Sequence, residues 1–167
     1  NDIFASANRS RGSYTETANA VAKMRMLAGD SFGSNQEAIG FTELLNKSLK
    51  VSGAGQAEQS AAFLQLTQAM AAGKLQGDEF RSVMENAPMV ADAIAKYTGK
   101  SKGELKELSS QGLITSDIIK NAMFNAADDI NGKFNSMPMT FADVWNQIKN
   151  TGMQAFGGVF EKANAML

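Results

Sequence analysis

The sequence contains neither cysteine nor histidine. Without cysteine there are no disulfides, thiolate nucleophiles or thiolate metal ligands. Without histidine, the chain lacks the usual imidazole ligand of zinc sites and the general base of Ser-His and Cys-His catalysis. No apolar run approaches the ~18 residues that a membrane span requires. We therefore expect no catalytic residue, no metal site, no cofactor and no transmembrane span in this sequence.

Positively and negatively charged residues are nearly balanced in number. Lysine and arginine total 16, and aspartate and glutamate total 17, which gives a formal net charge of −1. A phosphate-binding surface normally carries a basic excess. The densest positive cluster, between Lys96 and Lys106, is interrupted by Glu104 and is typical of a solvated surface. We expect no specific nucleic-acid partner.

The apolar residues recur at spacings of three and four, and no alternating strand pattern of useful length is present. Ser-x-x-Glu capping boxes beginning at Ser13, Ser34 and Ser101 predict three helix starts. The two prolines, Pro88 and Pro138, predict helix boundaries. The fold class predicted is all-α: a compact bundle of about six to eight short and medium helices, with a longer C-terminal helix that runs off the end of the sequence.

This pattern divides the chain into three parts. Residues 1–12 lack sustained periodicity and are predicted to form a loose N-terminal lead-in. Residues 13–138 are predicted to form the compact helical domain, in which residues 115–137 make one long helix. Residues 139–167 are predicted to form an amphipathic C-terminal helix, capped by Thr140, that continues in a longer protein.

One segment matches a catalytic motif. Residues 29–33 read GDSFG and fit G-x-S-x-G, the nucleophile elbow in which a strand-turn-helix presents a serine to a histidine base. Here the segment lies between two predicted helices, in a chain without histidine. We interpret it as an interhelical loop.

Paired carboxylates are the other catalytic candidates, because acid–base chemistry can use two acids alone. Asp78 and Glu79 are sequence neighbours, as are Asp128 and Asp129. Neighbours on a helix point about 100° apart, so neither pair converges on one substrate. A hydrolase that uses more distant acids remains an alternative.

Part of the sequence recurs after 39 residues, the interval from Gly73 to Gly112. The first copy consists of Gly73, Leu75, Asp78, Phe80, Arg81, Met84, Asn86 and Ala87, and the second of Gly112, Ile114, Asp117, Ile119, Lys120, Met123, Asn125 and Ala126. Two copies are too few for a solenoid. Duplication and chance recurrence of the same helix-turn-helix pattern both remain open.

Methionine and phenylalanine are unusually frequent, with ten of each. Most fall on predicted apolar stripes and are interpreted as core residues. The last predicted helix differs, because Trp145, Phe156 and Phe160 have no later element to cover them. We predict that these three residues form a partner-contact face, packed on further chain, a second copy or a partner helix.

Four segments carry a family resemblance. They are GKLQGDEFRSVMENAP (73–88), GKSKGELKEL (99–108), GLITSDIIKNAM (112–123) and MPMTFADVWNQIKN (137–150). In this order and spacing, over about residues 30–160, the chain resembles the tape measure domain of tailed-phage tape measure proteins. The resemblance supplies no catalytic residues.

The resemblance implies a virion component of a phage or prophage, made in the bacterial host cytoplasm and held inside the tail tube. Tail-tube subunits polymerise around such a protein, its length sets the tail length, and it leaves ahead of the DNA during infection. The implied partners are tail tube and tail tip proteins, tail assembly chaperones and a second copy of the chain.

The predicted breaks prevent a single rod, so we expect a folded helical module attached to the ruler, not the measuring shaft itself. Two other classes stay open. One is a carboxylate-dependent cell-wall hydrolase module, and the other is a generic helical protein-interaction adaptor.

Overall fold

The computed structural model describes residues 2–53 and 55–166, with side chains described up to residue 157. Within these residues the fold is all-α, as predicted, with no strand beyond one isolated bridge between Lys74 and Thr115. A short 3₁₀ helix, η1 (Gly29–Ser31), follows the second helix. The α-helices are α1 (Asp2–Arg9), α2 (Tyr14–Ala28), α3 (Asn35–Val51), α4 (Gln56–Ala72), α5 (Gly77–Asn86), α6 (Pro88–Thr98), α7 (Lys102–Ser110), α8 (Ser116–Asn125), α9 (Ala127–Asn135) and α10 (Phe141–Met166).

The three predicted serine caps begin α2, α3 and α7. The hydroxyls of Ser13, Ser34 and Ser101 each accept a hydrogen bond, 3.1 Å long, from the backbone N–H three residues later. At Ser101 the box is reciprocal, because the Glu104 carboxylate accepts from the Ser101 N–H at 3.2 Å. These bonds satisfy N–H groups that a helix start otherwise leaves without a partner.

Apolar side chains from α2 to α9 form one continuous core. Helix α3 supplies Phe41, Leu45 and Leu49, each of which is fully buried. Residues from α4, α6 and α8 pack around them, and burial of this apolar surface is the main stabilising term. No described side chain of α10 belongs to this core.

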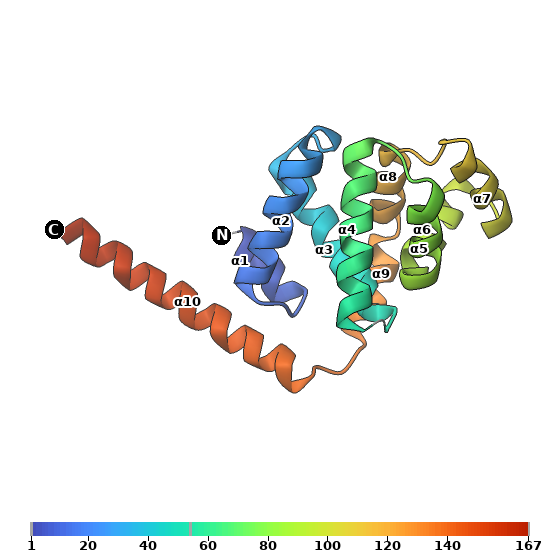
Figure 1. The fold of residues 1–167 in the computed structure, drawn as a ribbon. Helices are drawn as coiled ribbons and strands as arrows, with labels where there is room; N and C mark the ends of the chain where they lie inside the picture. Colours follow the sequence, from blue (N-terminus) through green and yellow to red (C-terminus); the bar gives the residue numbers. More distant parts are fainter. Residues whose placement is uncertain (1, 54, 167) are drawn as a thin grey trace.

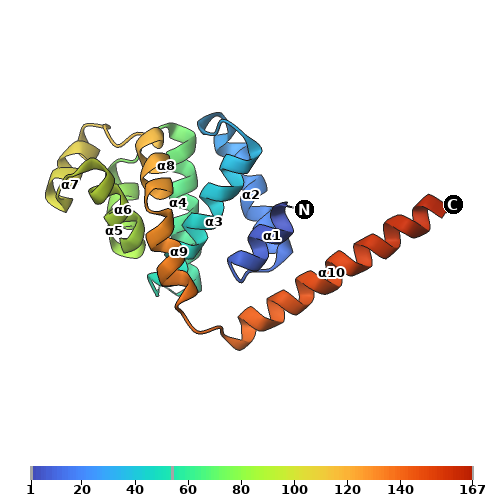
Figure 2. The ribbon, with the colours of Figure 1, turned by 180° about the vertical axis from the view of Figure 1, so that it is seen from behind.

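Helices α1 to α9 form a helical body, and α10 leaves it as an arm (Figure 1). At one end of the body, α5, α6 and α7 lie together; α1 and α2 lie at the other end. The arm passes beside α1 and then extends away from the body, as the view from behind also shows (Figure 2). The C-terminal end of α10 is therefore far from α7.

The structure corrects two predictions about the N-terminal part and the number of helices. The expected loose lead-in over residues 1–12 is helical from Asp2 to Arg9, with Ala7 fully buried. This short helix is fixed by contacts that are distant in sequence, since Arg9 donates hydrogen bonds to Glu43 of α3 at 2.9–3.1 Å. The described residues form ten α-helices, more than the six to eight expected.

The single helix predicted over residues 115–137 is also wrong. It is two helices, α8 and α9, separated at Ala126, where the backbone φ is −90° and ψ is 5°. The two segments pack against different partners, α8 mainly on α6 and α9 mainly on α3. The break at Ala126 therefore follows from tertiary packing, because no glycine or proline lies there to end the helix.

Candidate functional site

Helix α10 begins at a cap that the sequence predicts. The Thr140 hydroxyl accepts from the Asp143 N–H at 3.1 Å, and the Asp143 carboxylate accepts from the Thr140 N–H at 2.9 Å. This reciprocal pair fixes the start of the helix just after Pro138. The first residue of the helix, Phe141, is 90% exposed.

One face of α10 is apolar and faces outward. Trp145 is 54% exposed and Ile148 is 57% exposed. Phe141, Trp145 and Ile148 follow at spacings of four and three, which places them on one side of the helix. Phe156 is 71% exposed, and Val144 at the edge of the stripe is also exposed. We name Phe141, Val144, Trp145, Ile148 and Phe156 the outer face of α10.

Two of the three predicted contact residues, Trp145 and Phe156, have described side chains, and the third, Phe160, does not. Trp145 and Phe156 lie on the outer face and present large apolar surface to solvent. The side chain of Phe160 lies outside the described side chains.

The opposite face of α10 is polar and touches the body. Asn150 is fully buried: its amide group donates to Asn8 Oδ1 at 3.0 Å and to the Gly12 carbonyl at 2.8 Å. Its side-chain oxygen accepts from the Tyr14 N–H at 2.6 Å. One turn earlier, Asn146 donates to the Arg11 carbonyl at 3.3 Å.

This arrangement is the reverse of an ordinary surface helix, which buries its apolar stripe and exposes its polar side. Asn150 follows Phe141 by nine residues, which is about 180° around the helix at ~100° per residue. Sequence reasoning missed Asn150 because a polar residue opposite an apolar stripe is normally solvated. The one available signal is its helical position relative to Asn146, and that signal is weak.

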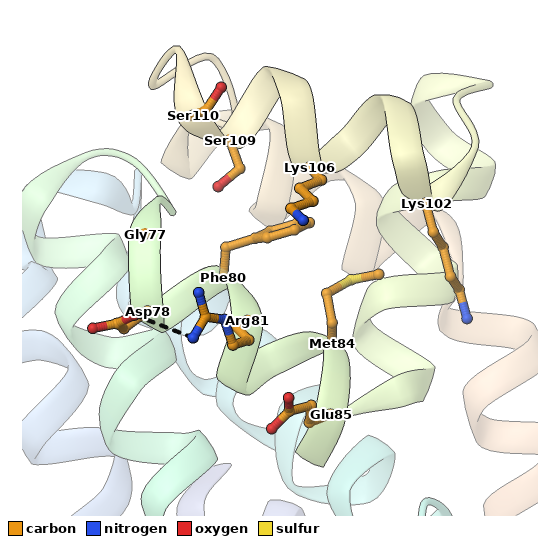
Figure 3. Close-up of a pocket in the computed structure, with 10 residues that line it drawn as sticks. All are labelled: Gly77, Asp78, Phe80, Arg81, Met84, Glu85, Lys102, Lys106, Ser109 and Ser110. Carbon is orange, nitrogen blue, oxygen red and sulfur yellow. Dashed lines mark ion pairs between the residues drawn. The ribbon is translucent and has the colours of Figure 1, made fainter.

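A hollow of about 400 Å³ lies between α5 and α7 (Figure 3). Phe80 and Met84 point from α5 toward α7, and Lys106 reaches from α7 toward Phe80. Lys102 and Arg81 add positive charge, although Lys102 is paired with Asp92 at 3.1 Å. The floor is therefore apolar and the rim is charged.

The α5–α7 hollow holds two carboxylates, Asp78 and Glu85, both exposed. They stand seven residues apart on one helix, a rise of ~10.5 Å at 1.5 Å per residue. Asp78 lies 3.9 Å from Arg81. Glycosidases place their two acids about 5–9.5 Å apart on opposite sides of a substrate. Two acids on a single helix do not provide that arrangement.

A second hollow, of about 460 Å³, lies among α2, α3 and α4. Glu16 is the one carboxylate that lines its described part, so no acid pair forms there. Lys50 also lines this hollow and donates to the Ser10 carbonyl at 2.8 Å. Burial lowers the pKa of Lys50, and the charges of Asp143 and Glu16 oppose that change.

The remaining catalytic candidates have structural roles. Ser31 of the GDSFG segment lies in η1, and its hydroxyl donates to the Met70 carbonyl at 2.7 Å. It is therefore a contact between a loop and α4, not an elbow above a sheet. Asp129 is in an exposed ion pair with Lys133 at 3.2 Å.

Among the described residues, no group of three acidic side chains is arranged to hold a metal ion. No helix in the described part of the chain combines the length and the apolar character needed to cross a bilayer.

No curated protein and no solved structure matches the chain. A family model described as "Tape measure protein" matches residues 1–161, which is nearly the whole sequence. The match covers the helical body and most of α10. The chain is a member of the tape measure protein family and has a structural role in the phage tail.

Proposed function

We propose that this chain is a folded helical module of a tape measure protein that presents the outer face of α10 to another tail component. The supporting observation is the reversed orientation of α10, with its polar side on the body and its apolar side in solvent. Large apolar side chains grouped on one exposed face are typical of a protein-interaction site. In this proposal the body, with residues 13–138 at its centre, is the platform and residues 139–167 are the arm.

The body is poorly suited to encode tail length. Its helices are short and fold back on one another, so adding residues to it does not add a fixed distance (Figure 1). A straight helix does so, and the 26 residues of α10 span ~39 Å at 1.5 Å per residue. We therefore assign length determination to a continuous helical part of the protein, and contact and assembly to this module.

The chemistry of the outer face fits a helical or grooved partner. Apolar anchors at spacings of three and four suit a second helix or an apolar groove. Asp143 and Lys149 are the charged side chains in the described part of α10, and the outer face includes neither of them. The partners that this face would meet in the tail are tail tube proteins, tail tip proteins, assembly chaperones or a second copy of the chain.

The proposed location is the interior of the virion tail tube, after synthesis in the cytoplasm of the bacterial host. There the module would take part in tail assembly and in genome delivery. In the described part of the chain, neither of the two hollows brings two carboxylates to face each other across a cleft, so they give no support to the hydrolase alternative. The adaptor alternative is contained in the present proposal, with the phage tail as its setting.

The test is a charge placed on the outer face. Trp145→Glu in the phage that encodes the protein should abolish co-purification with the tail partner and prevent normal tail assembly. Met26→Glu is the matched control, because Met26 is 78% exposed and lies on α2. Normal tails from the Trp145→Glu phage would contradict the contact role.

A second experiment separates contact from measurement. An in-frame deletion confined to the helical body should disturb assembly without giving a regular series of shorter tails. Tails that shorten in proportion to the residues removed, with assembly otherwise normal, would refute the module and support a ruler.

A further inference from the structure

Asn146 and Asn150 join the arm to the body through hydrogen bonds. We propose that Asn150 is the positioning residue of α10: its buried amide holds the helix at one rotation, so that the outer face points away from the body. This inference rests on the proposed function, because it concerns how the proposed contact surface is presented. It is independent of which tail component binds there.

Asn150 uses both of its side-chain N–H donors and one of the two lone pairs of its side-chain oxygen. A side-chain amide offers two N–H donors and a carbonyl oxygen. Here the donors bind Asn8 Oδ1 and the Gly12 carbonyl, and the oxygen binds the Tyr14 N–H. These three partners lie at the end of α1, in the following loop and at the start of α2. A rotation or one-residue slip of α10 would break these hydrogen bonds and leave the buried Asn150 amide without its partners.

Apolar packing does not supply the same restraint. No described side chain of α10 belongs to the continuous core, and its described large apolar side chains are 44–90% exposed. Non-directional apolar contacts also tolerate small rotations, whereas a buried asparagine accepts few geometries. Buried asparagines fix helix register in coiled coils for this reason.

The loop that receives Asn150 is itself held in place. Arg11 has a left-handed backbone, with φ of 59°, and its guanidinium donates to the Met137 carbonyl at 2.9 Å. The same group lies 4.7 Å from the centre of the Phe134 ring on α9. Lys50 of α3 donates to the Ser10 carbonyl at 2.8 Å. Asn150 is therefore bound to a loop anchored on α3 and α9.

The experiment measures the position of the arm directly. Because the chain has no cysteine, Arg25→Cys on α2 and Gln154→Cys on α10 provide two exposed positions for spin labels. Double electron–electron resonance should then give one narrow distance distribution for the parent. Asn150→Ala removes all three hydrogen bonds. Asn150→Asp keeps the side-chain size but lacks both N–H donors.

Both variants should broaden the distance distribution at least twofold, while the helical circular dichroism and melting midpoint of the body stay close to the parent values. Thr151→Ala is the control, since Thr151 is the next residue and is exposed. It should leave the distribution narrow. A narrow, unshifted distribution in both Asn150 variants would overturn the proposal, and so would a broad distribution in the parent.

Unfolding of the whole chain by Asn150→Ala would also overturn it, because Asn150 would then be required for the fold and not for positioning alone. The distance measurement uses the chain without any tail component. A negative result for Asn150 would therefore leave the Trp145→Glu test of partner contact unaffected. In turn, Trp145→Glu changes the opposite face and should not alter the measured distance.

Discussion

The backbone N–H of Leu75 donates to the carbonyl oxygen of Ile114 at 2.8 Å, and both side chains are buried. The Ser116 N–H completes the bridge with the Gly73 carbonyl at 2.9 Å. Leu75 and Ile114 occupy equivalent positions in the two copies of the 39-residue recurrence. The bridge therefore joins the two copies at their turns.

The correspondence extends beyond the sequence letters. Each copy has a left-handed glycine, with φ of 87° at Gly73 and 69° at Gly112. A ten-residue helix follows in both copies, and the next helix begins immediately after Ala87 or Ala126. These shared details favour duplication over chance recurrence.

Gly73 provides the first prediction. Gly73→Ala should destabilise the chain by ~1–2 kcal/mol, because a left-handed backbone costs that much for a residue with a Cβ. Space is not the cause, since nothing lies within 4 Å of the Cβ position. Gly29→Ala is the control: its φ is −56° and its Cβ position is also open, so it should be neutral or stabilising by up to ~1 kcal/mol. Urea unfolding curves that rank the two variants the other way would contradict the argument.

The second prediction compares two phenylalanines. Phe80 is 6% exposed and packs in the core, so Phe80→Ala should cost ~3–5 kcal/mol. Phe141→Ala removes the same atoms from a side chain that is 90% exposed and should change the free energy of unfolding by less than ~0.5 kcal/mol. Chemical denaturation of the two variants measures both values. Equal losses would show that α10 is covered by the body in solution.

Local sequence rules predict the features of this fold that depend on neighbouring residues. The caps at Ser13, Ser34 and Ser101 and the stop at Gly73 each involve groups within four residues. Helix α1 is different, because its attachment through Arg9 and Glu43 joins residues 34 positions apart. No periodicity within twelve residues contains that information.

The candidate site was predictable only in part for the same reason. The periodicity identifies an apolar stripe containing Trp145 and Phe156, but periodicity cannot tell whether a stripe faces the body or the solvent. That depends on Asn150, whose partners Asn8, Gly12 and Tyr14 lie more than 130 residues away. A pattern of single residues gives no means of pairing such distant groups.

A group of charges joins α1, α3 and α9, in which Glu43 and Lys47 are buried and Arg9 is exposed. Glu43 accepts from Lys47 at 2.9 Å and from Arg9 at 2.9–3.1 Å, and Lys47 also donates to Asn131 at 2.7 Å. Burial raises the pKa of Glu43, but the hydrogen bonds from Arg9 and Lys47 outweigh burial and bring the pKa below its ordinary value. The ionised form is therefore the one that the fold stabilises.

The third prediction follows from the lowered pKa of Glu43. A carboxyl group whose pKa is lower in the folded state stabilises the protein above its unfolded pKa of about 4.3, and this contribution is lost as the pH falls through the folded pKa. At pH 7, Glu43→Gln should cost on the order of 3 kcal/mol, because Lys47 then lies buried without a carboxylate. Below about pH 4.3 the difference in unfolding free energy between parent and variant should shrink, because the parent loses the stabilisation by the Glu43 carboxylate, which the variant lacks.

The pKa values of Glu37 and Glu104 are also lowered, by hydrogen bonds from Lys120 and the Ser101 backbone respectively. Both groups are present in parent and variant, so their contributions cancel in the difference. Unfolding free energies measured from pH 7 to pH 3 test this, and a gap that stays constant or widens in acid would show that the Glu43 carboxylate is not stabilised in the folded chain.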